Sequence, residues 1–595
     1  MTRAGEEPES EAPARGARLL LALAAVAVAF AAADTYVVVL ALPEMMASVG
    51  LAVDELQRGA PIVSGFLLGY VAMLPLIGRI ADLRGRVPVL VGSLVVFALG
   101  SLVTAAAYDL PSMVVGRFLQ GVGGGGLVPA TLAMVADMYP PARRGVPLGV
   151  VGAVQELGSV VGPLYGALVL AVADWEEIFW INLAVGLVLA AALLKVRREP
   201  SPIRHEPSPI RHDVLGALLA LLAVLSLALV MLEPDALATG VTTGLAFLPV
   251  TGDSRWLSPL ALVLFALLAA FGARCLLTAR PLVDLRGWRW LAGQADLIGA
   301  GLMAASLSGI ILAFATADPE VEVFSPVGAW LLAGSAVAAV CFWWRNRRTA
   351  NPLIPHGAFA QAPAWGALVV SFFVGAALIA ALVDIPIFAR VTVYPESQLM
   401  AALVLVRLLV ALPVGALVGG FLIRRLAAGV VTALGMALAA AGFAWMARWG
   451  LESLGQPLAT VPLVITGLGF GLALAPVNAA LLVATDDAVH GVTSAMLVVA
   501  RMVGMLVGIS ALTTIGLRRY YAVQVDLPPP AEVCGSRTQC AEYTTMLKEA
   551  GLAQLQTVFV GAAVCALTAA VLALLLFRSA QTRGVSSAEV LRQAG

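Results

Sequence analysis

The chain has 595 residues, of which 61% are apolar and 12% are charged, and its mean hydropathy is +0.95. This composition excludes a water-soluble globular protein, because too few polar residues are present to cover a folded surface. The 36 Lys and Arg balance the 36 Asp and Glu, so no excess positive charge favours nucleic acid as a partner. The sequence is that of an integral membrane protein.

Long apolar runs recur along the chain, and runs of about 18 to 25 residues can cross a bilayer as helices. The first run is too long for a signal-peptide core and is expected to remain as a helix. Sixteen runs are predicted to span: 19–42, 60–78, 87–108, 112–136, 146–171, 177–194, 214–232, 259–277, 297–316, 326–344, 365–389, 400–423, 428–447, 459–483, 491–516 and 556–577. If 297–316 or 326–344 lies along the membrane surface, the number falls towards fourteen.

Positive charge is distributed unevenly over this topology. With the N-terminus inside, the cytoplasmic side holds 25 Lys and Arg, including Arg274 at the cytoplasmic end of the run 259–277, and the outer loops hold eight. Arg117, Arg407 and Arg501 lie deeper within spans. Cytoplasmic loops of membrane proteins carry such an excess. Both termini are therefore predicted to be cytoplasmic.

A short charged connection, Gly78-Arg-Ile-Ala-Asp82-Leu-Arg84-Gly85-Arg86, joins the second and third runs. Glycine permits the reversal, and arginine beside the membrane favours the cytoplasmic side. An ordinary turn would explain the arginines but not Asp82 and Gly85 at these offsets. The segment resembles the signature loop of the major facilitator superfamily, Gly-x-x-x-Asp-x-x-Gly-Arg. The resemblance implies an all-α transporter with two six-helix halves.

An internal repeat also indicates two related halves. Without a gap and at a constant shift of 346 residues, Gly121, Gly145, Gln155, Gly158 and Gly162 correspond to Gly467, Gly491, Arg501, Gly504 and Gly508. Transporters are commonly built from such repeats around a central site.

A second repeat lies between the halves. The stretch from Asp213-Val-Leu-Gly-Ala to Arg280-Pro-Leu-Val-Asp recurs, shortened, from Asp296-Leu-Ile-Gly-Ala to Asn351-Pro-Leu-Ile-Pro, and each copy holds two apolar runs. The fourteen-helix drug:proton antiporter branch of the superfamily carries one such hairpin, so two are expected here. The predicted organisation is an N-terminal half (1–194), a Pro-rich cytoplasmic linker (195–213), central hairpins (214–364), a C-terminal half (365–577) with an outer loop (518–556), and a cytoplasmic tail (578–595).

Patterns for nucleotide, metal or covalent chemistry are weak. Neither Lys195 nor Lys548 follows the glycine spacing of a phosphate-binding loop, and the glycines of 121–126 continue an apolar run, which favours helix packing over dinucleotide binding. All histidines lie in loops: His205, His212, His356 and His490. A membrane enzyme acting on lipids would need a nucleophile with a nearby base, and no Gly-x-Ser-x-Gly elbow is present. The sequence predicts no enzyme, cofactor or metal, and transport driven by an ion gradient.

Ionisable residues inside spans are costly and therefore functional candidates. Asp34 and Arg117 lie at similar depth, about 13 and 9 Å from the outer ends of their spans. Their segments, Ala33-Asp34-Thr-Tyr and Gly116-Arg117-Phe-Leu-Gln120-Gly121, resemble antiporter motifs whose aspartate and arginine are linked to proton coupling. Asp384, the approximate counterpart of Asp34 in the second half, is a further candidate proton carrier. The alternative is a static buried ion pair.

Opposite charges also occupy matched positions in the two halves. Glu156 and Arg501 lie at nearly equivalent points of the repeat, each about 15 Å from the cytoplasmic face, and would suit a gate between the halves. Arg407, about 12 Å from the outer face, is a competing partner for Glu156. The sequence leaves both pairings open.

The fifth span carries a glycine-rich motif, Gly158-Ser-Val-Val-Gly162-Pro163-Leu-Tyr-Gly166, that resembles the motif marking exporters. It is expected to combine close packing with a proline bend where this helix meets the other half. The polar and aromatic residues that follow are expected to form an interfacial belt: Trp175, Phe179, Trp180 and Asn182.

The outer loop before the last span is the only sizeable hydrophilic region outside the membrane in this topology. Cys534 and Cys540 flank five residues on the oxidising side, which predicts a disulfide-closed loop. Residues 519–524 are expected to extend the preceding helix until Pro528 stops it.

Two passages, Asp34-Thr-Tyr-Val-Val-Val and Gln155 to Gly166, resemble mycobacterial triacylglyceride exporters, which work with a periplasmic lipoprotein and are also associated with drug efflux. The resemblance implies a proton-coupled exporter of bulky hydrophobic substrates, most of all triacylglyceride-type lipid, in a bacterial plasma membrane, with a lipid-carrying lipoprotein as a candidate partner. Efflux of lipophilic drugs is the alternative. A scaffold that had lost transport would lack the intramembrane charges, and they are present.

Overall fold

The computed structural model describes residues 15–51, 56–140, 143–197, 213–252, 254–278, 281–287, 294–315, 327–394, 398–534 and 540–580. The described residues form helices and connecting turns, without strands. The long helices are α1 (Arg15–Ser48), α2 (Leu56–Arg84), α3 (Arg86–Ala105), α4 (Leu110–Met138), α5 (Gly145–Leu170), α6 (Trp175–Arg197), α7 (Val214–Leu232), α9 (Pro259–Leu277), α11 (Leu297–Ala315), α12 (Gly328–Arg348), α13 (Ala362–Thr392), α14 (Gln398–Leu422), α15 (Ala428–Met446), α16 (Thr460–Val483), α17 (His490–Val525) and α19 (Ala541–Leu576).

Fourteen of these helices contain a described stretch long and apolar enough to cross a membrane. The other two are α5, whose described apolar stretch is Gly145–Gln155, and α12, whose last turn holds three arginines. The prediction of an all-α, multi-pass architecture is confirmed, and both members of each predicted central hairpin are helices.

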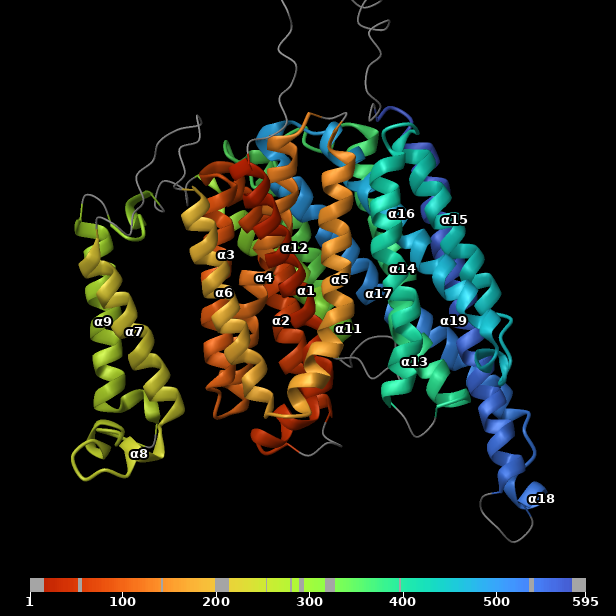
Figure 1. The fold of residues 1–595 in the computed structure, drawn as a ribbon, viewed down its shortest axis with the longest axis horizontal. Helices are drawn as coiled ribbons and strands as arrows, with labels where there is room; N and C mark the ends of the chain where they lie inside the picture. The colour runs from red at the N-terminus through yellow and green to blue at the C-terminus, as the bar shows by residue number, and fades with distance from the viewer. Residues whose placement is uncertain are drawn as a thin grey trace, which may run out of the picture.

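Helices α1–α6 form one half and helices α13–α17 with α19 form the other, side by side in Figure 1. Equivalent helices pack in equivalent ways, α1 on α5 and α13 on α17, α2 on α4 and α14 on α16. The repeat positions mediate these contacts, since Gly158 lies against the backbone of Ala29 and Gly504 lies against the backbone of Phe372. A β-carbon would collide with that backbone in both places, so small residues allow the close approach.

The two halves meet at the end that carries the signature loop, which the charge distribution predicts to be cytoplasmic. There Gly78 of α2 lies against Gly491 of α17, and Gly145 and Gly149 of α5 lie against Gly420 of α14. Toward the opposite end α5 and α14 diverge in Figure 1. The described contacts therefore correspond to a molecule closed at the predicted cytoplasmic end.

Each of the two central hairpins contains the same type of internal ion pair. An aspartate at the N-terminus of the first helix pairs with an arginine near the end of the second, Asp213 with Arg274 at 3.0 Å and Asp296 with Arg345 at 2.8 Å. Each aspartate also accepts a hydrogen bond from the backbone of its own first turn. The repeated sequence thus folds into two copies of the same clasped hairpin.

Helices α17 and α19 are the longest in the described structure, with 36 residues each. At 1.5 Å per residue such a helix is about 54 Å long, well beyond a hydrocarbon core of about 30 Å. The outer parts protrude at the lower right of Figure 1, where the short helix α18 (Pro530–Cys534) lies. Helix α17 ends at Val525, as the run before Pro528 predicts.

Candidate functional site: a buried ion pair beside an apolar cavity

The centre of the N-terminal half holds a buried ion pair. Arg117 Nη1 of α4 lies 2.9 Å from Asp34 Oδ2 of α1, and the residues are 1% and 2% exposed. The structure thus brings together the two residues that the sequence places at similar depth. Charges this deep are tolerated only when they are paired and hydrogen-bonded, so each depends on the other.

Polar neighbours orient the arginine. Gln120 accepts a hydrogen bond from Arg117 Nη1 at 2.8 Å, and its own Nε2 donates to Ser101 Oγ at 2.9 Å. The guanidinium carbon also lies 4.6 Å from the ring centre of Phe66 and 5.7 Å from that of Phe179. Aromatic faces stabilise a cation through their quadrupole. The guanidinium of Arg117 therefore has favourable contacts in addition to its ion pair with the carboxylate.

Asn182 of α6 completes the carboxylate environment. Its Nδ2 donates to Asp34 Oδ1 at 2.5 Å, and the residue is 1% exposed. The expectation that the start of α6 forms an interfacial belt is therefore wrong for Asn182, and also for Trp175 and Phe179, which are buried. These residues face α1 and α4 because α6 packs on the N-terminal core. The signal available in the sequence was a polar residue, Asn182, one turn after Phe179 in an otherwise apolar run.

The exporter motif packs α5 against the helix that carries Asp34. Gly158 lies against Ala29, Gly162 against Ala33 and Gly166 against Val37. The expectation that this motif meets the other half is wrong, because α5 reaches α14 through Gly145 and Gly149 instead. The side chain of Pro163 lies outside the described residues. The motif fixes the position of α1 on both sides of Asp34.

Asp384 of α13 is 5% exposed, and no ion pair of the described residues includes it. It therefore differs from Asp34, its approximate counterpart, which has a cationic partner.

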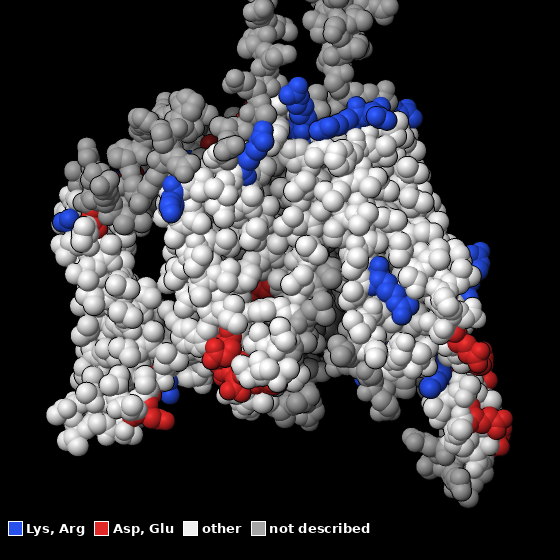
Figure 2. All heavy atoms as spheres, viewed as in Figure 1, with Lys and Arg blue, Asp and Glu red and all other residues white. Residues whose placement is uncertain are grey.

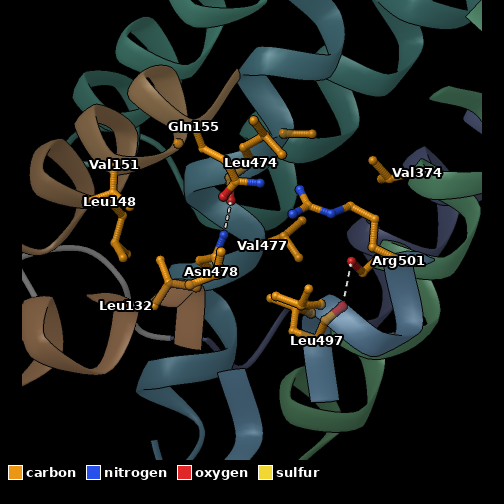
Figure 3. A pocket seen from close by; sticks show the side chains of 15 residues that line it. Leu132, Leu148, Val151, Gln155, Val374, Leu474, Val477, Asn478, Leu497 and Arg501 are labelled. Carbon is orange, nitrogen blue, oxygen red and sulfur yellow. Dashed lines mark hydrogen bonds between the residues drawn. The ribbon is translucent and has the colours of Figure 1, made fainter. Parts of the chain in front are cut away.

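A central cavity lies between the halves (Figure 3). Gln155 of α5 and Arg501 of α17, which are equivalent positions of the internal repeat, point into it from opposite sides. Most other lining residues are apolar: Val128, Leu132, Leu148, Val151, Leu474 and Val477 around one part, and Val28, Ala31, Phe66, Leu378 and Met505 around another. Arg501 is the only charged residue among the described residues that line either part.

Of the residues predicted to form the gate, Arg501 and Arg407 can be located and Glu156 cannot. The side chain of Glu156 lies outside the described residues, so neither of its pairings can be measured. Arg501 faces the cavity, whereas Arg407 Nη1 donates to Thr460 Oγ1 of α16 at 3.1 Å. The arrangement puts Arg501 at the shared cavity and gives Arg407 a partner within its own half.

The signature loop forms a latch between the halves. Asp82 accepts hydrogen bonds from the backbone N–H groups of Gly491 at 2.7 Å and Val492 at 3.0 Å, at the N-terminus of α17. It also pairs with Arg86, which in turn contacts Asp137 at 3.2 Å. A carboxylate is favoured at a helix N-terminus by the free N–H groups and the helix dipole.

The remaining signature residues have separate places. Gly85 forms the turn with a φ of +92°, a conformation that glycine adopts without strain, and Gly78 allows the close contact with Gly491. Arg84 lies 3.5 Å from Asp284, in the segment that precedes α11. The loop therefore touches the C-terminal half and the central hairpins.

No group of three or more His, Cys, Asp or Glu within the described ranges could hold a metal ion. His205 and His212 lie outside those ranges. His490 is buried, and its Nε2 contacts the carbonyl oxygens of Leu482 and Thr485. Cys534 and Cys540 form a disulfide at the outer end of the protruding helices.

Two related six-helix halves around a shared cavity define the class of multi-pass membrane transporters. Within that class, the chain belongs to the Major Facilitator Superfamily, whose family model matches residues 24–344.

Relatives in mycobacteria resemble the chain over most of its length. A triacylglyceride transporter of Mycolicibacterium smegmatis is 32% identical, with 94% of this chain and 88% of the relative covered. A triacylglyceride transporter of Mycolicibacterium hassiacum is 34% identical, with 87% and 84% covered. The crystal structure of the human organic anion transporter MFSD10 is similar with a TM-score of 0.52 and 14% identity, covering 94% of this chain and 99% of that one. The last similarity supports the fold alone.

Proposed function

We propose that the chain is a proton-coupled exporter that moves bulky hydrophobic molecules, in particular triacylglyceride-type lipids, by alternating access. The observation that carries this proposal is the buried pair of Asp34 and Arg117 on helices that also line an apolar cavity. Proton binding to Asp34 would neutralise the carboxylate and weaken its hold on Arg117. Because a buried unpaired charge is costly, the protonated and ionised states would favour different arrangements of α1, α4 and α6.

The cavity lining supports a neutral, apolar substrate. Acyl chains need no counter-charge, whereas a cation would be repelled by Arg501, the one charged side chain among the described lining residues. The mycobacterial relatives are named triacylglyceride transporters, which supports the same substrate class. Efflux of lipophilic drugs is the second candidate, favoured by the same apolar lining.

Alternating access requires that the latch end opens. We infer that separation of Asp82 from the N-terminus of α17 accompanies opening, with Glu156 and Arg501 as the gate pair and Asp384 as a second proton carrier. Lys and Arg gather along the latch end in Figure 2, which supports a cytoplasmic placement of that end and of both termini. The setting proposed is a bacterial plasma membrane, with a lipid-carrying lipoprotein as a partner at the outer end.

Uptake into inverted vesicles tests this function. A fluorescent triacylglyceride and a lipophilic cationic dye are offered separately under an imposed pH gradient. We expect the lipid to accumulate and the accumulation to stop when the gradient is collapsed. Accumulation of the dye but not the lipid would assign the second candidate function, and gradient-independent movement of both would refute proton coupling.

A further inference from the structure

The second central hairpin occupies a place that the first does not. Each boundary between the two halves that faces the membrane is here called a seam, and the two seams are formed by α2 with α17 and by α5 with α14. Helix α11 packs on α2 and also touches α17. We propose that this hairpin seals the α2–α17 seam, so that hydrophobic substrate exchanges between bilayer and cavity only through the α5–α14 seam. The substrate class rests on the proposed function.

One face of α11 is buried along most of its length. Ala300, Met303, Leu307 and Ile311 follow each other at intervals of three and four residues, and they are 5%, 8%, 9% and 0% exposed. These residues belong to the same apolar cluster as the core of both halves. Intervals of this kind place side chains on one helix face, so α11 presents a continuous apolar strip to the seam.

Helix α12 forms a second layer outside α11. Ser335 Oγ donates to the carbonyl oxygen of Ser306 at 2.6 Å, and Gly309 lies against the backbone of Leu331. The opposite face of α12 is open, with Trp330 81% and Val337 64% exposed. Exposed apolar side chains of this size fit a lipid-facing surface, so we assign α12 as the membrane-facing layer of a two-helix cover.

The ends of the hairpin are held by both halves. Before α11, Asp284 pairs with Arg84 of the signature loop at 3.5 Å. After α12, Ala358 packs on Val489 and Val492 at the start of α17. The cover is therefore attached on both sides of the seam that it closes.

The first hairpin provides an internal comparison. It has the same aspartate–arginine clasp, yet it contacts the rest of the molecule near the outer end of α3, where Trp256 Nε1 donates to the hydroxyl of Tyr108 at 2.9 Å. In Figure 1 it stands apart at the left, whereas α11 and α12 lie on the far side, behind the N-terminal half, with α11 in contact with α2 and α17. The internal structure of the hairpin therefore does not by itself determine whether the hairpin packs over a seam.

Among the described helices, none covers the opposite seam. In Figure 1 α5 and α14 face the viewer, and no described helix lies in front of them. Their outward faces are apolar and open, with Leu157 49% and Val410 54% exposed. Gln155, two residues before Leu157, lines the cavity, so α5 presents one face to the outside of the protein and another to the interior.

The proposal is tested by photolabelling the full chain in liposomes that contain a triacylglyceride with a diazirine in one acyl chain. In a variant lacking Cys275, Cys341 and Cys565, Val410→Cys is coupled to a bulky bilayer-soluble maleimide. Val337→Cys on α12, coupled in the same way, is the matched control. Lipid adducts on cavity residues such as Leu378 and Met505 are located by mass spectrometry.

We expect loss of cavity adducts when position 410 is blocked and no loss when position 337 is blocked. Retention of half or more of the adducts in the 410-blocked protein would show that the α2–α17 seam is also open and would overturn the proposal.

Loosening the cover with Met303→Ala and Leu307→Ala should restore cavity labelling in the 410-blocked protein. If that variant does not fold, the comparison of positions 410 and 337 still decides. Labelling does not require transport, so a failure of the proposed function would appear as missing gradient-driven uptake with the labelling pattern intact.

Discussion

Asp34 neutralises Arg117, and in the proposed function the same side chain also receives the proton. The residue is 2% exposed, and Asn182 holds its second carboxylate oxygen. A carboxylate that served only as a counter-ion would need neither a cavity nearby nor a motif that fixes its helix. The residue is therefore the strongest site for separating coupling from stability.

Asp34→Asn is expected to abolish gradient-driven uptake while the protein still inserts and folds. The amide preserves volume and accepts a hydrogen bond, but it cannot carry the proton. Leaving Arg117 without its counter-charge should lower Tm, at a cost of up to about 3 to 5 kcal/mol. Asp34→Glu should retain part of the uptake, and Asp235→Asn, in the short helix α8 (Asp235–Ala238), serves as the control. Wild-type uptake with an unchanged pH dependence in the Asn variant would rule Asp34 out.

Asp213 is expected to give the first hairpin an acid-sensitive clasp. Hydrogen bonds from the Gly216 N–H and from Arg274 hold the pKa of Asp213 below its usual value. A depressed folded-state pKa stabilises the protein above the unfolded pKa, and the contribution disappears as pH falls through the folded pKa. Asp213→Asn should therefore lower Tm at pH 7 and lower it by less near pH 3. Equal losses of Tm at both pH values would contradict the assignment.

At the scale of helices, sequence patterns predicted the presence of the helices, the internal repeat and the duplicated hairpin, since each depends on local periodicity. The length of α19 was not predicted, because it begins at Ala541, well before the apolar run that starts near residue 556. They did not predict docking partners. The spacing of Gly158 and Gly162 indicates a close approach, yet either the same half or the other could supply the neighbour. Likewise α11 is apolar on all sides, so its buried strip cannot be distinguished from its lipid-facing one before the tertiary contacts are known. Asn182 was missed because a polar residue near a helix start also fits an interface.

Gly158→Val should separate α5 from α1, because a β-carbon there meets the backbone of Ala29. Overpacking of this kind costs about 1 to 3 kcal/mol, and the shift of α1 should also weaken uptake. Gly92→Val on α3 is a matched control, since no other group lies within 4 Å of its added β-carbon. Thermal unfolding in detergent compares the two. A smaller loss of Tm at position 158 than at position 92 would show that this close contact is not limiting.

Cys534 and Cys540 should be oxidised in protein purified without reductant, because both lie in the predicted outer region. Mass spectrometry of the peptide that contains both residues measures the expected mass loss of two hydrogens. The free thiols of Cys341 and Cys565 serve as internal references for alkylation. Quantitative alkylation of all four residues without reduction would refute an oxidised outer loop.

At the scale of the whole molecule, the structure is closed at the latch and the cavity lies between the halves. We expect Glu156 and Arg501 to be close in this state and to separate when the latch opens. Cysteines at positions 156 and 501, in a background without native cysteines, should crosslink efficiently, and Asp82→Asn should reduce the yield by weakening the latch. A 156–407 pair is the control. Efficient 156–407 crosslinking in every state, with none between 156 and 501, would make Arg407 the partner.

Helix α17 joins the latch to the outermost part of the protein as one continuous rod. Backbone N–H groups of its first turn donate hydrogen bonds to Asp82 of the signature loop. Its far end lies about 54 Å away, beside the disulfide-closed tip. If the helix tilts about its latch end as a rigid body, each degree displaces the far end by about 0.9 Å. A change of a few hydrogen bonds at one face of the membrane would thus be magnified into a movement of several ångströms at the other. The position of the protruding tip would then depend on whether Asp82 is hydrogen-bonded to the N-terminus of α17.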